Sequence, residues 1–223
     1  KPYPWVQGDA LRVLLHGDSM LATVVDATNI DSYPYGAQGA LIGDLLGQSD
    51  TWSSGVGGSG WMAPAVHDRS WFNERVDIDV IANAPDVIIE MGGGNDAALN
   101  PGQATIQALV ETWLSKVLAA KPETVIFMTG PIIGSNAGAA HLTINAAKQA
   151  AAAKFPRNVI YIDTLADPWV SGTGRDGAAI GDGNRDWVTG TDGAHPTMEG
   201  HRYFAGRVAR AVAKAIPTLI AAQ

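Results

Sequence analysis

Residues 11–20 read LRVLLHGDSM, an apolar run that leads directly into a polar turn. Residues 11–15 are nearly continuous in apolar side chains, as is typical of a strand covered on both faces of a parallel sheet. Gly17 permits a tight turn after this strand, and Ser19 then falls near the start of the helix that follows. A serine at such a place is either an N-cap, whose oxygen accepts a backbone N–H, or a nucleophile.

Similar apolar runs predict the rest of the sheet. Strands are expected at 87–91, 124–128 and 159–162, with a less apolar candidate at 51–54. Apolar residues at helical spacing predict helices at 38–46, 103–120, 139–155 and 198–215. This alternation of strands and helices predicts a doubly wound α/β sandwich. The length of 223 residues is compatible with a single domain over residues 1–223.

Composition narrows the class of protein. Hydrophobic residues make up 46% and charged residues 17%, as in globular proteins. A net charge of -7 argues against nucleic acid as a partner, because binding a phosphate backbone needs a basic face. The absence of cysteine excludes disulfides, thiolate metal sites and a cysteine nucleophile.

No apolar run approaches the roughly 20 residues of a membrane span. Neither a signal-peptide pattern nor an initial Met is visible, so trimming is expected, and secreted and cytoplasmic locations both stay open.

A glycine-rich turn follows the candidate strand at 51–54. Residues 55–60 read GVGGSG and match the G-x-G-x-x-G fingerprint of dinucleotide sites. No helical pattern follows, and the same spacing recurs at Gly172, Gly174 and Gly177, so the match discriminates little. We interpret residues 55–60 as a turn whose backbone N–H groups face an oxyanion or a phosphate.

Two further turns carry polar residues suited to catalysis. Residues 91–96 read MGGGND, and the Asn95 amide can donate to a developing negative charge, although Asn and Asp also simply suit turns. Histidine changes its charge near neutral pH, which makes His195 a candidate general base. Asp192 is placed to fold back and hold the imidazole in the required tautomer. Pro196 disfavours helical geometry at His195 and keeps it in the turn before the last helix.

Together these turns provide a nucleophile, a base, an orienting acid and oxyanion donors, which are the roles that acyl transfer requires. On these residues the sequence resembles the GDSL or SGNH hydrolases, a family named for four blocks that contribute Ser, Gly, Asn and His. The matching segments are 17–20 (GDSM, with Met where Leu is usual), 55–60, 93–96 (GGND) and 192–196 (DGAHP). The resemblance places the glycine of the oxyanion hole at Gly58.

The resemblance implies a flavodoxin-like, three-layer α/β/α sandwich with a central parallel sheet of about five strands. It also implies ester hydrolysis without a metal or a cofactor. In the implied mechanism Ser19, His195 and Asp192 act through an acyl-enzyme on Ser19. The oxyanion hole then consists of the N–H groups of Ser19 and Gly58 and the amide of Asn95. Asp192 is preferred to Asp18 as the orienting acid, because Asp18 directly adjoins the nucleophile.

The substrate class is a narrower expectation. Flat aromatic faces stack on sugars, and several tryptophans fall in segments near the expected site or in the irregular stretch 166–194. A stretch of this length without periodicity is either a functional lid or a disordered segment. Small acyl or acetyl esters, including esters of carbohydrates, are the expected substrates. The candidate substrate-binding residues are Asp18, Trp61, Trp169 and Trp187. Three alternatives remain: an acyltransferase with the same residues, a carbohydrate-binding module on an inactive hydrolase scaffold, and a nucleotide-binding protein.

Overall fold

The computed structural model describes residues 11–25, 30–32, 37–64, 71–134, 137–172, 183–190 and 192–221. Its centre is a sheet of five parallel strands. These strands are β1 (Val13–Gly17), β4 (Thr51–Gly55), β5 (Val87–Met91), β6 (Val125–Thr129) and β7 (Val159–Ile162). The predicted parallel sheet is confirmed, and it includes the less apolar run at 51–54.

The strand order places a ligand site at one end of the sheet. Across the sheet the order is β4-β1-β5-β6-β7, so the chain builds outward from β1 first to one side and then to the other. This is the flavodoxin-like order, in which ligands bind beyond the carboxyl ends of the strands at the point where the winding direction reverses. That point lies between β1 and β5, which precede Ser19 and Asn95 respectively.

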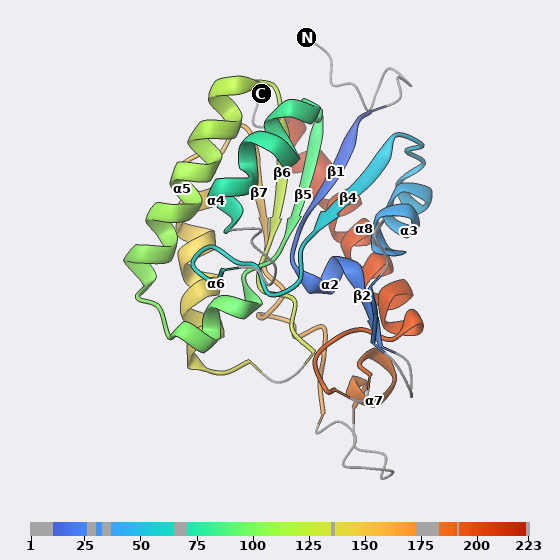
Figure 1. Cartoon of the computed structure of the whole chain (residues 1–223). Coiled ribbons are helices and arrows are strands. Elements are labelled where there is room, and N and C mark those ends of the chain that lie inside the picture. Colours follow the sequence, from blue (N-terminus) through green and yellow to red (C-terminus); the bar gives the residue numbers. More distant parts are fainter. Residues whose placement is uncertain are drawn as a thin grey trace.

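Helices cover both faces of the sheet and complete the three-layer α/β/α sandwich. Figure 1 shows α4 (Phe72–Arg75), α5 (Gln103–Ala120) and α6 (Ala139–Ala152) on one face. On the opposite face lie α3 (Ala37–Leu46) and α8 (Met198–Ala221). None of the helices in the described part of the chain combines the length and apolar character needed to cross a membrane.

The first three residues of strand β1 are all apolar because they contribute to two separate cores. Val13 and Leu15 join the core on the α3 and α8 side, whereas Leu14 joins the core on the α5 and α6 side. All three side chains are fully buried. At about 25 cal/mol per Å² of apolar surface removed from water, each such side chain stabilises the fold by roughly 1.5–3 kcal/mol. The two cores therefore hold the end of β1, and the turn after it, in a fixed position.

Several details differ from the sequence prediction. Helix α6 ends at Ala152, and α8 continues through Pro217, whose fixed φ is compatible with a helix although the ring removes one hydrogen-bond donor. The helix expected at Ser19 is the short α2 (Ser19–Ala22). The antiparallel pair β2 (Thr23–Val25) and β3 (Ile30–Ser32) and the helical segment 72–83 were not predicted. The predicted irregular stretch 166–194 contains the short helix α7 (Arg185–Val188), and its residues 173–182 and 191 lie outside the described residues.

Candidate active site

The turn after β1 places Ser19 at the first position of α2. Gly17 is required here, because a Cβ at this position would lie 2.2 Å from the carbonyl oxygen of Met91 on the neighbouring strand. Asp18 acts as the N-cap of α2, and its Oδ1 accepts the backbone N–H of Met20 at 2.9 Å. The interpretation of Ser19 as an N-cap is therefore wrong, because Asp18 fills that role. The Ser19 hydroxyl has another partner.

That partner is His195. The Nε2 atom of His195 lies 2.9 Å from Ser19 Oγ, and its Nδ1 atom lies 2.5 Å from Asp192 Oδ2. The second carboxylate oxygen of Asp192 accepts the backbone N–H groups of Ala194 and His195, each at 3.0 Å. Although partial burial alone acts to raise it, the hydrogen bonds from His195 and the backbone lower the pKa of Asp192. An ionised Asp192 accepts the Nδ1–H, which leaves Nε2 to accept the serine proton.

The chain folds back on itself to bring His195 over Ser19, which lies 176 positions away in the sequence. Thr189 and Pro196 form an antiparallel bridge, and Gly190 donates its N–H to the His195 carbonyl at 2.8 Å. Helix α8 begins only at Met198. His195 therefore lies in the turn before the last helix, as the proline after it predicts. Its side chain keeps about a quarter of its surface exposed, which leaves the site open to solvent.

The glycine-rich turn lies directly beside the serine. Gly58 adopts a φ of +74°, a left-handed conformation that favours glycine. A Cβ on Gly57 would lie 3.9 Å from the Cβ of Ser19, so the turn packs against the serine without a side chain between them. The amide of Asn95 donates to the carbonyl of Ser59 at 3.0 Å. Ser19, Gly58 and Asn95 thus lie together at the carboxyl ends of β1, β4 and β5.

Asp96 is a residue of this site whose role the sequence interpretation missed. Its carboxylate accepts three consecutive backbone N–H groups, from Trp61, Met62 and Ala63, at 2.7–2.9 Å. Gly60 must lack a side chain, because a Cβ there would come within 2.6 Å of the same carboxylate. Burial raises the pKa of Asp96, while these hydrogen bonds oppose that rise. Asp96 thereby ties the turn after β5 to the chain that follows the glycine-rich turn.

A buried ion pair contacts the turn that follows β5. Lys148 on α6 and Glu90 on β5 are both fully buried, and their charged atoms lie 2.8 Å apart. Lys148 Nζ also donates to the carbonyl of Gly92 at 2.7 Å, at the start of the turn that carries Asn95. Burial raises the pKa of Glu90 to about 7, and the nearby Lys148 opposes this shift. A glutamate inside the otherwise apolar run VIIEM is the sequence signal that could have indicated this pair.

The structure corrects part of the predicted substrate-binding set. Trp61 is fully buried and packs edge-to-face on Phe72 at 4.9 Å, so its predicted stacking on a substrate is wrong. Asp18 is 2% exposed and serves as the helix cap, so its predicted contact with a substrate is wrong as well. Trp169 is 7% exposed and lines a small, partly open pocket of about 60 Å³. Trp187 is 43% exposed and keeps surface available for a ligand.

Two further kinds of site, a metal site and the dinucleotide site that the glycine-rich turn resembles, can be compared with the described ranges. There we find no group of three or more His, Asp or Glu side chains placed to hold a metal ion. The glycine-rich turn at 55–60 leads into an irregular segment at 61–64 instead of a helix. A dinucleotide fingerprint requires that helix, because its N-terminus binds the pyrophosphate. The turn therefore lacks the structure of a dinucleotide site.

The fold and the side chains at its carboxyl edge are those of a parallel α/β protein equipped for ester hydrolysis. The chain belongs to the GDSL-like lipase/acylhydrolase family, whose model matches residues 15–203. It is therefore a carboxylic ester hydrolase. A search of curated proteins gave no match.

Solved structures share the fold at low sequence identity. A carbohydrate esterase family 2 enzyme with a carbohydrate-binding domain, from Corynascus thermopiles (Myceliophthora fergusii), superposes with a TM-score of 0.63 at 16% identity, covering 94% of this chain and 68% of that chain. A family 3 carbohydrate esterase from Clostridium thermocellum gives 0.57 at 15% identity, covering 92% and 99%. An acetyl esterase mutant with an acetate ion gives 0.57 at 16% identity, covering 93% and 98%.

Proposed function

We propose that the protein hydrolyses esters of small acyl groups through an acyl-enzyme on Ser19. The observation that carries this proposal is the unbroken line of contacts from Ser19 Oγ to His195 Nε2 and from His195 Nδ1 to Asp192, at 2.9 and 2.5 Å. A weak nucleophile such as a serine hydroxyl needs an adjacent base, and the base needs a third group to orient it. These three side chains meet that requirement.

The proposed reaction proceeds in two halves. His195 Nε2 takes the Ser19 proton as Ser19 Oγ attacks the ester carbonyl, and the carbonyl oxygen becomes an oxyanion. When the tetrahedral intermediate collapses, the C–O bond to the alcohol breaks and His195 returns the proton to the leaving alcohol. In the second half His195 deprotonates a water molecule, the resulting hydroxide attacks the acyl-enzyme, and Ser19 regains its proton as the carboxylic acid leaves. Asp192 stays ionised throughout and stabilises the imidazolium.

The proposed oxyanion hole consists of the backbone N–H groups of Ser19 and Gly58 and the side-chain amide of Asn95. Each of these residues comes from a different strand end, and the contacts described above hold the three together. An amide carries two N–H groups. One N–H of Asn95 bonds the Ser59 carbonyl, which orients the amide and leaves the second N–H for the substrate oxyanion.

Replacing Asn95 by alanine is expected to lower kcat by roughly 10²–10³-fold, equivalent to about 3–4 kcal/mol of transition-state stabilisation. Steady-state kinetics with p-nitrophenyl acetate measure this loss. The matched control is Asn158→Ala, because the amide of Asn158 also donates to main-chain carbonyls, here those of Pro122 and Thr124, but lies before β7 at the opposite end of the sheet. Full activity in the Asn95 variant would exclude this oxyanion role.

The proposed substrate class is acetyl or similarly short esters, including esters carried by carbohydrates. Two observations support it. The similar structures include proteins described as carbohydrate esterases and an acetyl esterase with acetate. Trp187, eight positions before His195, keeps 43% of its surface exposed, and exposed tryptophan rings suit the apolar faces of sugars. The line of contacts at Ser19 favours an active enzyme over an inactive carbohydrate-binding scaffold.

A set of esters tests this substrate class. The p-nitrophenyl esters of acetate, butyrate and octanoate vary only the acyl chain, and acetate release from an acetylated cello-oligosaccharide tests the carbohydrate. We expect kcat/KM to fall as the acyl chain lengthens, together with measurable acetate release from the sugar. A preference for octanoate, without any acetate release, would contradict the proposed class. Adding an acceptor alcohol and measuring the product ratio distinguishes hydrolysis from acyl transfer.

A further inference from the structure

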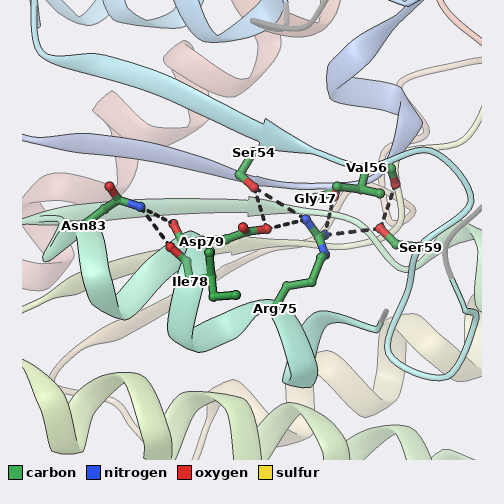
Figure 2. Close-up of polar contacts among 8 residues, drawn as sticks. All are labelled: Gly17, Ser54, Val56, Ser59, Arg75, Ile78, Asp79 and Asn83. Atoms are coloured by element: carbon green, nitrogen blue, oxygen red, sulfur yellow. Dashed lines mark hydrogen bonds and ion pairs between the residues drawn. The ribbon is translucent and has the colours of Figure 1, made fainter. Parts of the chain in front are cut away.

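Arg75 is a buried arginine directed at the two chain segments that form the proposed site. It ends α4 and is only 5% exposed. Figure 2 shows its guanidinium reaching past the helical segment toward Gly17, at the end of β1, and Ser59, in the turn after β4. A charged side chain is rarely buried unless it is paired, so its partners indicate what it does.

The guanidinium joins the two segments through one nitrogen. Arg75 Nη2 donates to the Gly17 carbonyl at 3.0 Å and to Ser59 Oγ at 3.2 Å. The Gly17 carbonyl also accepts the N–H of Val56 at 3.2 Å, and Ser59 Oγ donates to the Val56 carbonyl at 2.7 Å. The end of β1 and the glycine-rich turn are thus linked directly and through Arg75. Ser19 lies two residues after Gly17, and Gly58 lies between the linked positions of the turn.

The second terminal nitrogen of the guanidinium, Nη1, is held by a carboxylate. Arg75 Nη1 lies 2.7 Å from Asp79 Oδ2 in a pair with side chains 5% and 15% exposed. Ser54 Oγ on β4 donates to the same oxygen at 2.8 Å. Asn83 donates to the carbonyls of Ile78 and Asp79, which holds the segment that carries the acid (Figure 2). The guanidinium therefore has a fixed orientation, and its charge is compensated.

We propose that Arg75 is a positioning residue that sets the separation between the Ser19 nucleophile and the oxyanion N–H of Gly58. This proposal rests on the proposed function. A planar guanidinium can hold several acceptors in fixed directions, whereas the ammonium of a lysine is a compact charge on a flexible chain. Displacing catalytic groups by about 1 Å can cost about 100-fold in rate. Loosening the contacts of Arg75 with Gly17 and Ser59 is therefore expected to lower kcat, although Arg75 does not touch the substrate.

A purely structural role makes a different prediction. If Arg75 only neutralised Asp79, lysine would restore both stability and activity, and any loss of activity would follow the fraction of unfolded protein. For a positioning role, Arg75→Lys recovers stability more than kcat, because one ammonium cannot reproduce the forked contacts. Ser59→Ala removes one partner of the fork and leaves the buried ion pair in place, so it tests positioning without exposing an unpaired charge.

The experiment compares kcat, KM and melting temperature for Arg75→Met, Arg75→Lys, Ser59→Ala and the Arg75→Met/Ser59→Ala double variant on p-nitrophenyl acetate. Val80→Ala is the matched control, because Val80 is fully buried in the adjoining helical turn and belongs to the apolar core on the α5 and α6 side. All rates are measured well below each melting temperature. We expect kcat of Arg75→Met to fall by about 100-fold with little change in KM, a smaller fall for Ser59→Ala, and a double variant close to Arg75→Met alone.

Three results would overturn the proposal. One is an Arg75→Met enzyme whose kcat stays within threefold of the natural protein. Another is full recovery of kcat in Arg75→Lys, and the third is a Val80→Ala variant that loses kcat as strongly. If Arg75→Met does not fold, Ser59→Ala and Arg75→Lys decide the question, and unchanged kcat in both contradicts it. Ser19→Ala is assayed alongside: an active Ser19→Ala refutes the proposed function itself, whereas an inactive Ser19→Ala with a fully active Arg75→Met refutes only the role of Arg75.

Discussion

Ser19→Ala is expected to lower kcat for ester hydrolysis by roughly 10⁶-fold, because removal of the nucleophile of a catalytic triad abolishes the covalent route. The hydroxyl is the only group that the substitution removes. Its hydrogen bond to His195 is replaced by solvent, and the N-cap bond from Met20 to Asp18 does not involve it. The melting temperature is therefore expected to stay close to that of the natural protein. Steady-state assays and thermal denaturation of the same preparation measure both quantities.

The matched control is Ser53→Ala. Ser53 lies on β4 opposite Leu15 of β1, so the same atom is removed from the neighbouring strand without touching the site. We expect it to leave kcat nearly unchanged. A Ser19→Ala protein that retains activity, after contamination by natural enzyme has been excluded, would contradict the assignment of the nucleophile.

Asp192→Asn is expected to lower kcat by roughly 10⁴-fold. The asparagine oxygen can still accept the backbone N–H groups of Ala194 and His195, so the turn keeps its shape. Its amide, however, donates to Nδ1 where the carboxylate accepted. The imidazole then carries its proton on Nε2, and this nitrogen can no longer accept the proton of Ser19.

Asp167→Asn is the control for this second substitution. Asp167 is 89% exposed and pairs with Arg207 on α8, away from the catalytic line of contacts. Because exposed ion pairs contribute about 0–1 kcal/mol, little change in stability or rate is expected. If Asp192→Asn lowered kcat no more than this control, Asp192 would not be the orienting acid.

Much of the fold was predictable from the sequence because each central strand is buried on both faces. Runs such as VIIEM at 87–91 are apolar except for Glu90 and show no polar alternation. The apolar residues of α5, in contrast, recur at helical spacing, so the two kinds of element are easily distinguished. The segment 72–83 was harder to predict because it changes from α-helical to π-helical and then to 3-10 geometry within twelve residues. Its buried apolar residues Phe72, Val76 and Val80 recur every four positions, which is the signal that could have indicated it.

The proposed catalytic residues Ser19, Asp192 and His195 were predictable because they follow a strand end or precede a helix and because, as a set, they supply the roles that acyl transfer requires. The supporting residues were not. Arg75 contacts Gly17 across 58 positions, and Lys148 contacts Gly92 across 56. A single charged residue in a helical pattern normally indicates the solvent-facing side, and only the packed structure shows these two buried. The same limit applies to Trp61, because a tryptophan in a turn suits a sugar platform and a core equally well.

Labelling with a fluorophosphonate, followed by peptide mapping, tests the central claim most directly. The reagent phosphonylates a serine that an adjacent base activates, and mass spectrometry of the digest identifies the modified residue. We expect a single label on Ser19 in the natural protein, none in Ser19→Ala, and strongly slowed labelling in Asp192→Asn. A label on any other residue, or no label on folded natural protein, would contradict the claim that Ser19 is the nucleophile.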